Sequence, residues 1–381
     1  MGICATISAM SNLHKTIFET LRGEILSGKY NPREKFPSEE QLRRRFKTSR
    51  STLRLALLHL KECSMIETRN GSGTFLSSTA RNMSGRLGLI VPHIAEGELS
   101  PPICAGIEKS ASENGYSLLF GDASSTDPKT RASRAIALAK DYIAQNVAGV
   151  FLEPIELVDN AFQVTKSIID IFKKLHIPIV LLDRDIVSPP QRSEYDLVSI
   201  DNVQIGYRLA THLIDRGAEH ICFFARPGSA PTVQLRFQGA REAALDHRPA
   251  QSKVRICLAE PTDVAVVGKL LSGRNPPDAF LCANDLTAVS LMKTLETLGK
   301  EVPRDILVTG IGDVKVAATS MPPLTTVRQP CGEIAKAAVA VMLQRLRNPS
   351  LPPRQILLDS PLIVRQSTTR RRRQAGHALR P

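Results

Sequence analysis

The sequence predicts an α/β protein in two parts: a small helical head with a β-hairpin, followed by a larger body of parallel sheets in two lobes. Three observations predict this fold. Three helical patterns and a hairpin signal fill residues 13–76. From Leu87 onward, short apolar runs alternate with helical stretches, as in parallel sheets covered by helices on both faces. The positive charge is concentrated near the two ends of the chain.

Composition excludes several classes of protein. With 381 residues, 42% of them hydrophobic and 23% charged, the chain has the values of a globular protein of two or three domains. No run approaches the roughly 18 apolar residues of a membrane helix. The seven cysteines are widely spaced and form no metal-binding pattern, which favours a reducing compartment. No secretory signal is present. We therefore expect a cytoplasmic protein with no metal, no cofactor and no membrane partner.

The net charge of +13 is unevenly distributed. Residues 1–80 hold 13 Lys/Arg against 7 Asp/Glu, and residues 365–381 hold six Arg and no acid. A basic head on a nearly neutral body predicts that the head meets a polyanion and the body something else. The run Arg370–Arg373 predicts a basic disordered tail over residues 368–381, because like charges in a run cannot be buried together.

The head, residues 1–76, is expected to begin with an amphipathic helix over residues 13–28, where apolar residues recur at three- and four-residue steps. Ser38, with Gln41 three residues later, has the pattern of a capping box for a second, short helix. Ser49 can then cap a third helix through about Glu62. Two short helices joined by a tight turn predict a helix-turn-helix.

A hairpin is expected after the third helix. Residues 65–68 and 73–76 alternate as strands around Asn70-Gly71, a strong hairpin-turn signal. A helix-turn-helix followed by a hairpin is a winged helix. Residues 77–86 are small and polar, the composition of a linker.

The start of the third helix is expected to read DNA. A helix in the major groove contacts base edges with its first turns, and Arg grips guanine or phosphate through two hydrogen bonds. The arginines of the preceding helix could instead form a solvated helix face. The residues expected at the DNA are Ser38, Arg44, Ser49, Arg50, Thr52, Arg54, Arg69, Asn70 and Gly71.

The whole head resembles the winged helix of the GntR family. The resemblance is carried by Pro37-Ser38-Glu39, Phe46, Ser49-Arg50, Thr52, Arg54, Ala56-Leu57, Leu60 and Gly71-Ser72-Gly73-Thr74-Phe75. It implies DNA contacts by Arg50 and Arg54, and by the wing. At the wing tip, Arg69 and Asn70 could enter the minor groove.

The body, residues 87–367, is expected to alternate strands and helices throughout. The expected strands are 87–91, 117–120, 149–152, 178–182, 197–200, 221–225, 253–258, 279–282 and 306–310. The expected helices are 101–114, 129–145, 160–175, 203–216, 234–246, 263–272, 285–298 and 331–346. So many strands suit two sheets better than one, and we therefore expect two lobes.

Parts of the body resemble the effector fold of the lactose and galactose repressors. The matching segments are 149–154, 177–184, 283–288, 302–306 and 322–327. Head and body together resemble the arabinose-repressor type of regulator, in which a GntR head replaces the usual head. The resemblance implies a periplasmic-binding-protein-like body with crossover strands, a dimer through the first lobe, and lobes near 87–200 plus 323–345 and 201–322 plus 346–367.

Polar residues that follow the expected strands predict a ligand site, because ligands of parallel sheets bind beyond the carboxyl ends of the strands. The candidates are Asp122, Glu153, Asp183, Arg184, Asn284, Asp285 and Asp313, with Arg236 near the start of a helix. Their side chains suit the hydroxyls of a sugar. The resemblance places ligand contacts at Arg236 and around Asn284-Asp285. Two alternatives remain: Asp285 as a helix cap, and Asp183 as the partner of a neighbouring arginine.

No catalytic pattern is found: the chain has no nucleophile elbow, phosphate loop or zinc-protease motif. We therefore expect a protein that is not an enzyme. The sequence favours a homodimeric regulator that binds double-stranded operator DNA, represses carbohydrate-use genes and is released by a small sugar. Two alternatives remain open. The same architecture could respond to a nucleobase or another metabolite, or the body could be a sugar-modifying enzyme.

Overall fold

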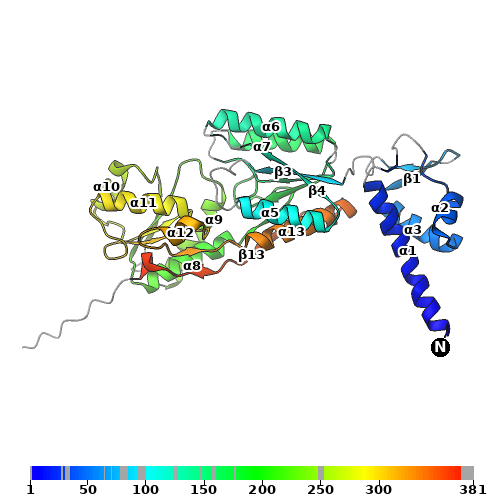
Figure 1. The fold of residues 1–381 in the computed structure, drawn as a ribbon. Helices are drawn as coiled ribbons and strands as arrows, with labels where there is room; N and C mark the ends of the chain where they lie inside the picture. The colour runs from blue at the N-terminus through cyan, green and yellow to red at the C-terminus, as the bar shows by residue number, and fades with distance from the viewer. Residues whose placement is uncertain are drawn as a thin grey trace, which may run out of the picture.

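The protein folds into a head and a two-lobed body arranged in a row (Figure 1). The computed structural model describes residues 2–26, 29–30, 35–63, 65–69, 71–77, 85–91, 100–123, 125, 127–145, 147–156, 160–175, 177–247 and 253–369. The head adjoins one lobe, and the other lobe lies at the far end of the molecule. Within the described ranges, no helix combines the length and the apolar character needed to cross a bilayer.

The head is a winged helix, as predicted. Its helices are α1 (Gly2–Leu26), α2 (Glu39–Phe46) and α3 (Arg50–Glu62), and its hairpin pairs β1 (Ile66–Arg69) antiparallel with β2 (Gly73–Leu76). Helix α1 begins earlier than the amphipathic pattern indicated. The expected hairpin is present, with Ile66 opposite Leu76 and Arg69 opposite Gly73, although Asn70 lies outside the described residues.

Local hydrogen bonds explain where the short helices of the head begin. The Ser38 hydroxyl accepts the Gln41 backbone N–H while the Gln41 side chain accepts the Ser38 N–H, which is the predicted capping box. The Ser49 hydroxyl caps α3 by accepting the Thr52 N–H at 3.2 Å. Gly71 has a φ of 73° at the tip of the hairpin, a conformation that glycine adopts without strain.

The first lobe is a six-stranded parallel sheet in the order β13-β7-β6-β5-β3-β4. Its strands are β3 (Arg86–Val91), β4 (Ser117–Asp122), β5 (Gly149–Leu152), β6 (Ile179–Leu182), β7 (Asp196–Ile200) and β13 (Gln355–Leu358). Helices α6 (Pro128–Ala144) and α7 (Ala161–Lys173) cover one face, and α5 (Ser100–Glu113) and α13 (Cys331–Arg347) cover the other (Figure 1).

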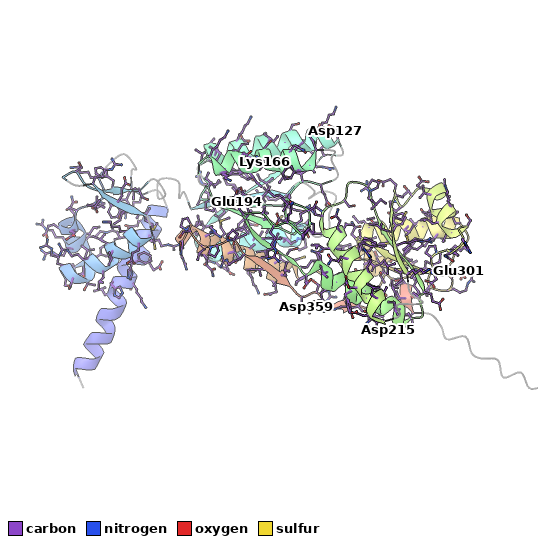
Figure 2. The ribbon with its side chains drawn as sticks, turned by 180° about the vertical axis from the view of Figure 1, so that it is seen from behind. Asp127, Lys166, Glu194, Asp215, Glu301 and Asp359 are labelled. Atoms are coloured by element: carbon purple, nitrogen blue, oxygen red, sulfur yellow. The ribbon has the colours of Figure 1, made fainter. Side chains whose placement is uncertain are left out.

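The second lobe is a four-stranded parallel sheet in the order β11-β10-β8-β9. Its strands are β8 (His220–Ala225), β9 (Lys253–Leu258), β10 (Ala279–Cys282) and β11 (Leu307–Thr309). Its helices are α8 (Asn202–Asp215), α9 (Thr232–His247), α10 (Val264–Leu271), α11 (Asp285–Thr297) and α12 (Lys315–Thr319). Seen from behind in Figure 2, Lys166 and Glu194 lie on the first lobe, and Asp215 and Glu301 on the second.

The expected division of the body into lobes needs a correction at its C-terminal end. Strand β13 pairs with β7, so residues 346–358 join the first lobe. Strand β12 (Thr326–Val327) pairs with β14 (Leu362–Ile363). Just before β12, the carbonyl of Thr325 accepts the N–H of Gly310, the residue that follows β11. These strands therefore belong to the second lobe. The bounds implied by the resemblance are therefore wrong here, because a short apolar segment does not itself specify which of two sheets it joins.

The expected C-terminal tail also begins too early. Thr368, in the short helix η1 (Gln366–Thr368), is fully buried, and its hydroxyl bonds to His212 and Thr325. The fold of the second lobe therefore includes residues 368 and 369. The arginine run that motivated the tail begins at residue 370 and lies outside the described residues.

Candidate functional site

The exposed arginines of the head lie around the start of α3. Arg50 and Arg54 have side chains that are 71% and 59% exposed. Both approach the same carboxylate, with Glu39 Oε2 at 3.5 Å from Arg50 Nε and 3.3 Å from Arg54 Nε. Exposed ion pairs of this kind are weak. The two guanidiniums are therefore accessible to the phosphates and base edges of DNA.

Other residues expected at the DNA have different surroundings. Arg44 is 80% exposed and pairs with Glu40. Thr52 is only 8% exposed and its hydroxyl bonds to Ser49, so it supports the cap of α3 from inside the head. Arg69 pairs with Glu67 beside the turn of the hairpin.

An ion pair that the sequence analysis did not find joins helix α2 to helix α1. Arg45 donates two hydrogen bonds to Glu24 and a third to Tyr30. These bonds from Arg45, against the effect of burial, lower the pKa of Glu24 to about 2. Arg45 therefore holds the head together, unlike its neighbour Arg44. Arg45 differs from Arg44 in its contact with Glu24, which lies 21 residues earlier in the chain, and no local sequence pattern reveals that contact.

A cleft of about 410 Å³ lies between the two lobes of the body, a size in the range of small-molecule sites. Its walls come from the carboxyl ends of strands in both sheets, as predicted for ligands of parallel sheets. The predicted residues that line it are Glu153, Asp183, Arg184, Arg236, Asn284 and Asp285. Among the residues that the structure describes, none that lines the cleft is aromatic.

Arg184 is the centre of the wall from the first lobe. Its side chain is 5% exposed and binds Glu153 at 2.5 Å, Asp183 at 2.8 Å and Glu156 at 3.1 Å. Its Nε donates to the carbonyl of Pro154. Burial and the neighbouring carboxylates raise the pKa of Glu153 to about 7, although Arg184 acts in the opposite direction. Asp183 is thus a partner of the neighbouring arginine and also a lining residue.

Arg236 is the buried cation of the second lobe and is 6% exposed. Its Nε donates to the Asn202 side chain at 2.7 Å, and its Nη1 donates to the Ala283 carbonyl at 2.6 Å. Two glycines bring α8 and α9 together at this point. A Cβ atom at Gly206 or at Gly239 would lie 1.9 Å from a carbonyl oxygen of the other helix. This close helix packing places Arg236 at the base of the cleft.

Asp285 lies at the start of α11 and is 1% exposed. Its carboxylate accepts the Thr326 hydroxyl at 2.6 Å and the Val314 N–H at 3.0 Å. Burial raises its pKa to about 6, although these hydrogen bonds lower it. The cap of α11 is Asn284, whose side chain accepts the Thr287 N–H. The alternative role of Asp285 as the side-chain cap is therefore wrong.

Asp313 stands apart from the cleft, and the side chain of Asp122 lies outside what the structure describes. Asp313 is not among the lining residues, because its carboxylate binds Arg365 at 2.5 Å and Arg328 at 2.6 Å. For Asp122 the structure describes the backbone at the end of β4 and not the side chain.

The sequence analysis also missed polar residues of the cleft. Glu156 accepts the N–H of Ala230 at 3.0 Å, a hydrogen bond between the two lobes. Arg226 pairs with Glu260 at 3.0 Å within the second lobe. Arg226 and Glu260 each follow an expected strand directly or within two residues, so the strand-end rule could have found both.

Comparison with known proteins assigns both parts of the chain. Residues 13–76 match the model of the bacterial regulatory proteins of the gntR family. Residues 210–368 match the model of the periplasmic binding protein-like domain. These matches cover the winged helix and most of the second lobe, together with the C-terminal segments that return to the first.

Curated relatives extend across both parts. The chain is 29% identical over 357 residues to the arabinose metabolism transcriptional repressor of Geobacillus stearothermophilus, covering 90% of this chain and 94% of that protein. It is 26% identical to the ribose operon repressor of Halalkalibacterium halodurans, covering 77% and 83%. A LacI-family regulator from Enterococcus faecium, solved with bound ribose, has the fold of the body, with a TM-score of 0.59, 21% identity and coverage of 74% and 98%.

The fold, the exposed arginines and the cleft define the class of protein: a DNA-binding transcriptional regulator with an effector domain. Within that class, the chain joins a gntR-family helix-turn-helix domain to a periplasmic binding protein-like domain, the combination that the sequence resemblance implied.

Proposed function

We propose that this regulator represses carbohydrate-use genes and leaves its operator when a small sugar binds between the lobes. The observation that carries the proposal is the cleft of about 410 Å³, which is lined by charged and amide side chains from both lobes. Carboxylates, amides and guanidiniums together match the donors and acceptors of sugar hydroxyls. The names of the arabinose and ribose repressors among the relatives support this class of ligand.

The charge balance of the cleft favours an uncharged sugar over an acidic or phosphorylated one. The two guanidiniums that face carboxylates are already neutralised, Arg184 by three acids and Arg226 by Glu260. Adding an anion would bring it close to these carboxylates, and like charges at short range repel. Arg236 is left as the buried donor for a neutral hydroxyl.

Release follows if the sugar binds one arrangement of the lobes better than the other. Closing the cleft would change the position of the first lobe, which adjoins the head.

We further propose a homodimer, since two heads on a palindromic site combine their weak individual contacts. We also propose that this regulator acts in the cytoplasm, where it can reach operator DNA, and that it has no catalytic role. Sedimentation of only monomers on an operator would contradict the dimer.

A thermal-shift screen of neutral pentoses and hexoses, their acidic and phosphorylated derivatives, and purines tests the effector. Binding to the native state raises the unfolding temperature with ligand concentration. We expect a saturable rise of several degrees with one neutral sugar and a smaller one with its acidic derivative. A rise with a purine and with no sugar would replace the proposed effector class.

A further inference from the structure

A second cavity, of about 240 Å³, lies where the head meets the body. It is smaller than the roughly 300–1,000 Å³ of sites for drug-sized ligands, so it suits an ion or a small metabolite. We call it the junction cavity. It is lined by Phe18, Glu19, Arg22, Cys63 and Met65 of the head and by Tyr116, Leu346 and Arg347 of the body.

The junction cavity contains a buried phenol hydroxyl, that of Tyr116. Tyr116 is 2% exposed, and its hydroxyl has no hydrogen-bond acceptor among the residues that the structure describes. Buried phenol hydroxyls normally have one. Burial raises the pKa of Tyr116, while the nearby guanidiniums of Arg22 and Arg347 lower it. The hydroxyl therefore lies close to two cations and lacks an acceptor.

The two arginines are only weakly compensated. Arg22 approaches Glu19 at 3.5 Å, and that carboxylate is 63% exposed. Arg347 is exposed at the end of α13 and has no ion pair or hydrogen bond with any residue that the structure describes. One guanidinium comes from the head and the other from the body. Each has several N–H donors arranged to bind an oxyanion through two hydrogen bonds.

We propose that the junction cavity binds a small oxyanion, a phosphate or a carboxylate, between Arg22, Arg347 and the hydroxyl of Tyr116. The apolar part of the lining, formed by Phe18, Met65 and Leu346, leaves room for a short hydrocarbon group. Met65 and Tyr116 already belong to one hydrophobic cluster that continues from the head into the body. A bound anion therefore strengthens the contact between head and body and acts on the DNA-binding domain independently of the cleft.

Thermal unfolding of the full chain tests this site, with chloride replaced at constant ionic strength by inorganic phosphate or by butyrate. We expect a saturable rise in unfolding temperature with at least one of the two anions. Arg347→Ala should weaken that binding by about tenfold, the loss of a charged hydrogen bond. Lys336→Ala removes one positive charge from the same helix, where Lys336 pairs with Glu333. This control should bind the anion like the unmodified protein.

Tyr116→Phe separates anion binding from packing, because it keeps the ring and removes only the hydroxyl. We expect weaker anion binding and, in chloride, undiminished stability. The proposal would be overturned if neither anion gave a saturable rise in unfolding temperature. It would also be overturned if Arg347→Ala and Tyr116→Phe both showed the same rise as the unmodified protein. Weaker operator binding by Arg347→Ala in chloride alone would overturn it too, because the oxyanion would then be a phosphate of the DNA.

Discussion

Helix α3 of the head and the cleft of the body both contain arginine paired with carboxylate, in opposite surroundings. The Arg54 side chain is 59% exposed and lies 3.3 Å from Glu39. The Arg184 side chain is 5% exposed and lies 2.5 Å from Glu153. An exposed pair exchanges its carboxylate for a DNA phosphate at little cost, whereas a buried pair is held because neither charge can return to water. The first arrangement suits reversible recognition, and the second suits a rigid wall.

The largest expected effect comes from breaking the buried cluster. Arg184→Ala leaves Glu153, Glu156 and Asp183 together without their cation, so the free energy of unfolding should fall by about 3–5 kcal/mol. Urea denaturation measures this. The control is Arg226→Ala, whose pair with Glu260 is about half exposed and should contribute at most about 1 kcal/mol. Equal, small effects of the two substitutions would remove the contrast between buried and exposed ion pairs.

The pH dependence of stability should also come from the cleft. The Asp285 pKa is raised from 3.8 to about 6, so between these values the native state holds a proton that the unfolded state has released. Stability then falls as pH rises through this window, by roughly 3 kcal/mol at most. Asp285→Asn should reduce the fall in unfolding free energy between pH 4 and 6, leaving the part that comes from Glu153, whose pKa is raised to about 7. Glu62→Gln, at the exposed end of α3 in the head, should keep the profile of the unmodified protein.

On the head, Arg54→Ala should weaken operator binding by about 1–3 kcal/mol, the value of one guanine contact through two hydrogen bonds. A gel-shift titration at fixed salt measures it. Lys166→Ala is the matched control: Lys166 is an exposed cation on α7 of the first lobe, paired with Asp170 (Figure 2). If both variants bound the operator alike, Arg54 would have no part in recognition.

The smallest effect is expected at Glu39, the carboxylate that both Arg50 and Arg54 approach. Glu39→Gln frees Arg50 and Arg54 from the carboxylate that DNA must displace. Operator affinity should therefore rise by about two- to fivefold, in line with the weak energy of exposed pairs. Fluorescence anisotropy of a labelled operator measures the change. Weaker binding would mean that Glu39 positions the arginines for DNA instead of competing with it.

The sequence predicted the elements well where local chemistry determines them. The capping box of Ser38 and Gln41 and the turn at Gly71 need only nearby residues, and both are present. The assignment of β13 to the first sheet depends on its pairing with β7, more than 150 residues earlier in the chain. No local pattern contains that pairing.

The candidate cleft was predicted in the same uneven way. Asp285 follows from the strand-end rule and Arg236 from its place near the start of a helix, the resemblance supports both, and both line the cleft. Asp313 satisfied the same rule, yet Arg328 and Arg365 occupy its carboxylate. Glu156 was missed because its contact with Ala230 exists only when the two lobes meet. Tertiary pairing therefore decides which of the strand-end residues face a ligand.

The most direct test of the account compares operator binding by the unmodified protein and by Arg236→Ala, with and without the neutral sugar found in the screen. Arg236 lies at the base of the cleft, bonded to Asn202 and Ala283, and has no place in the head. We expect the variant to bind the operator with unchanged affinity and to remain bound when the sugar releases the unmodified protein. Loss of operator binding by the variant, or release at the same sugar concentration, would contradict control of the head by the cleft.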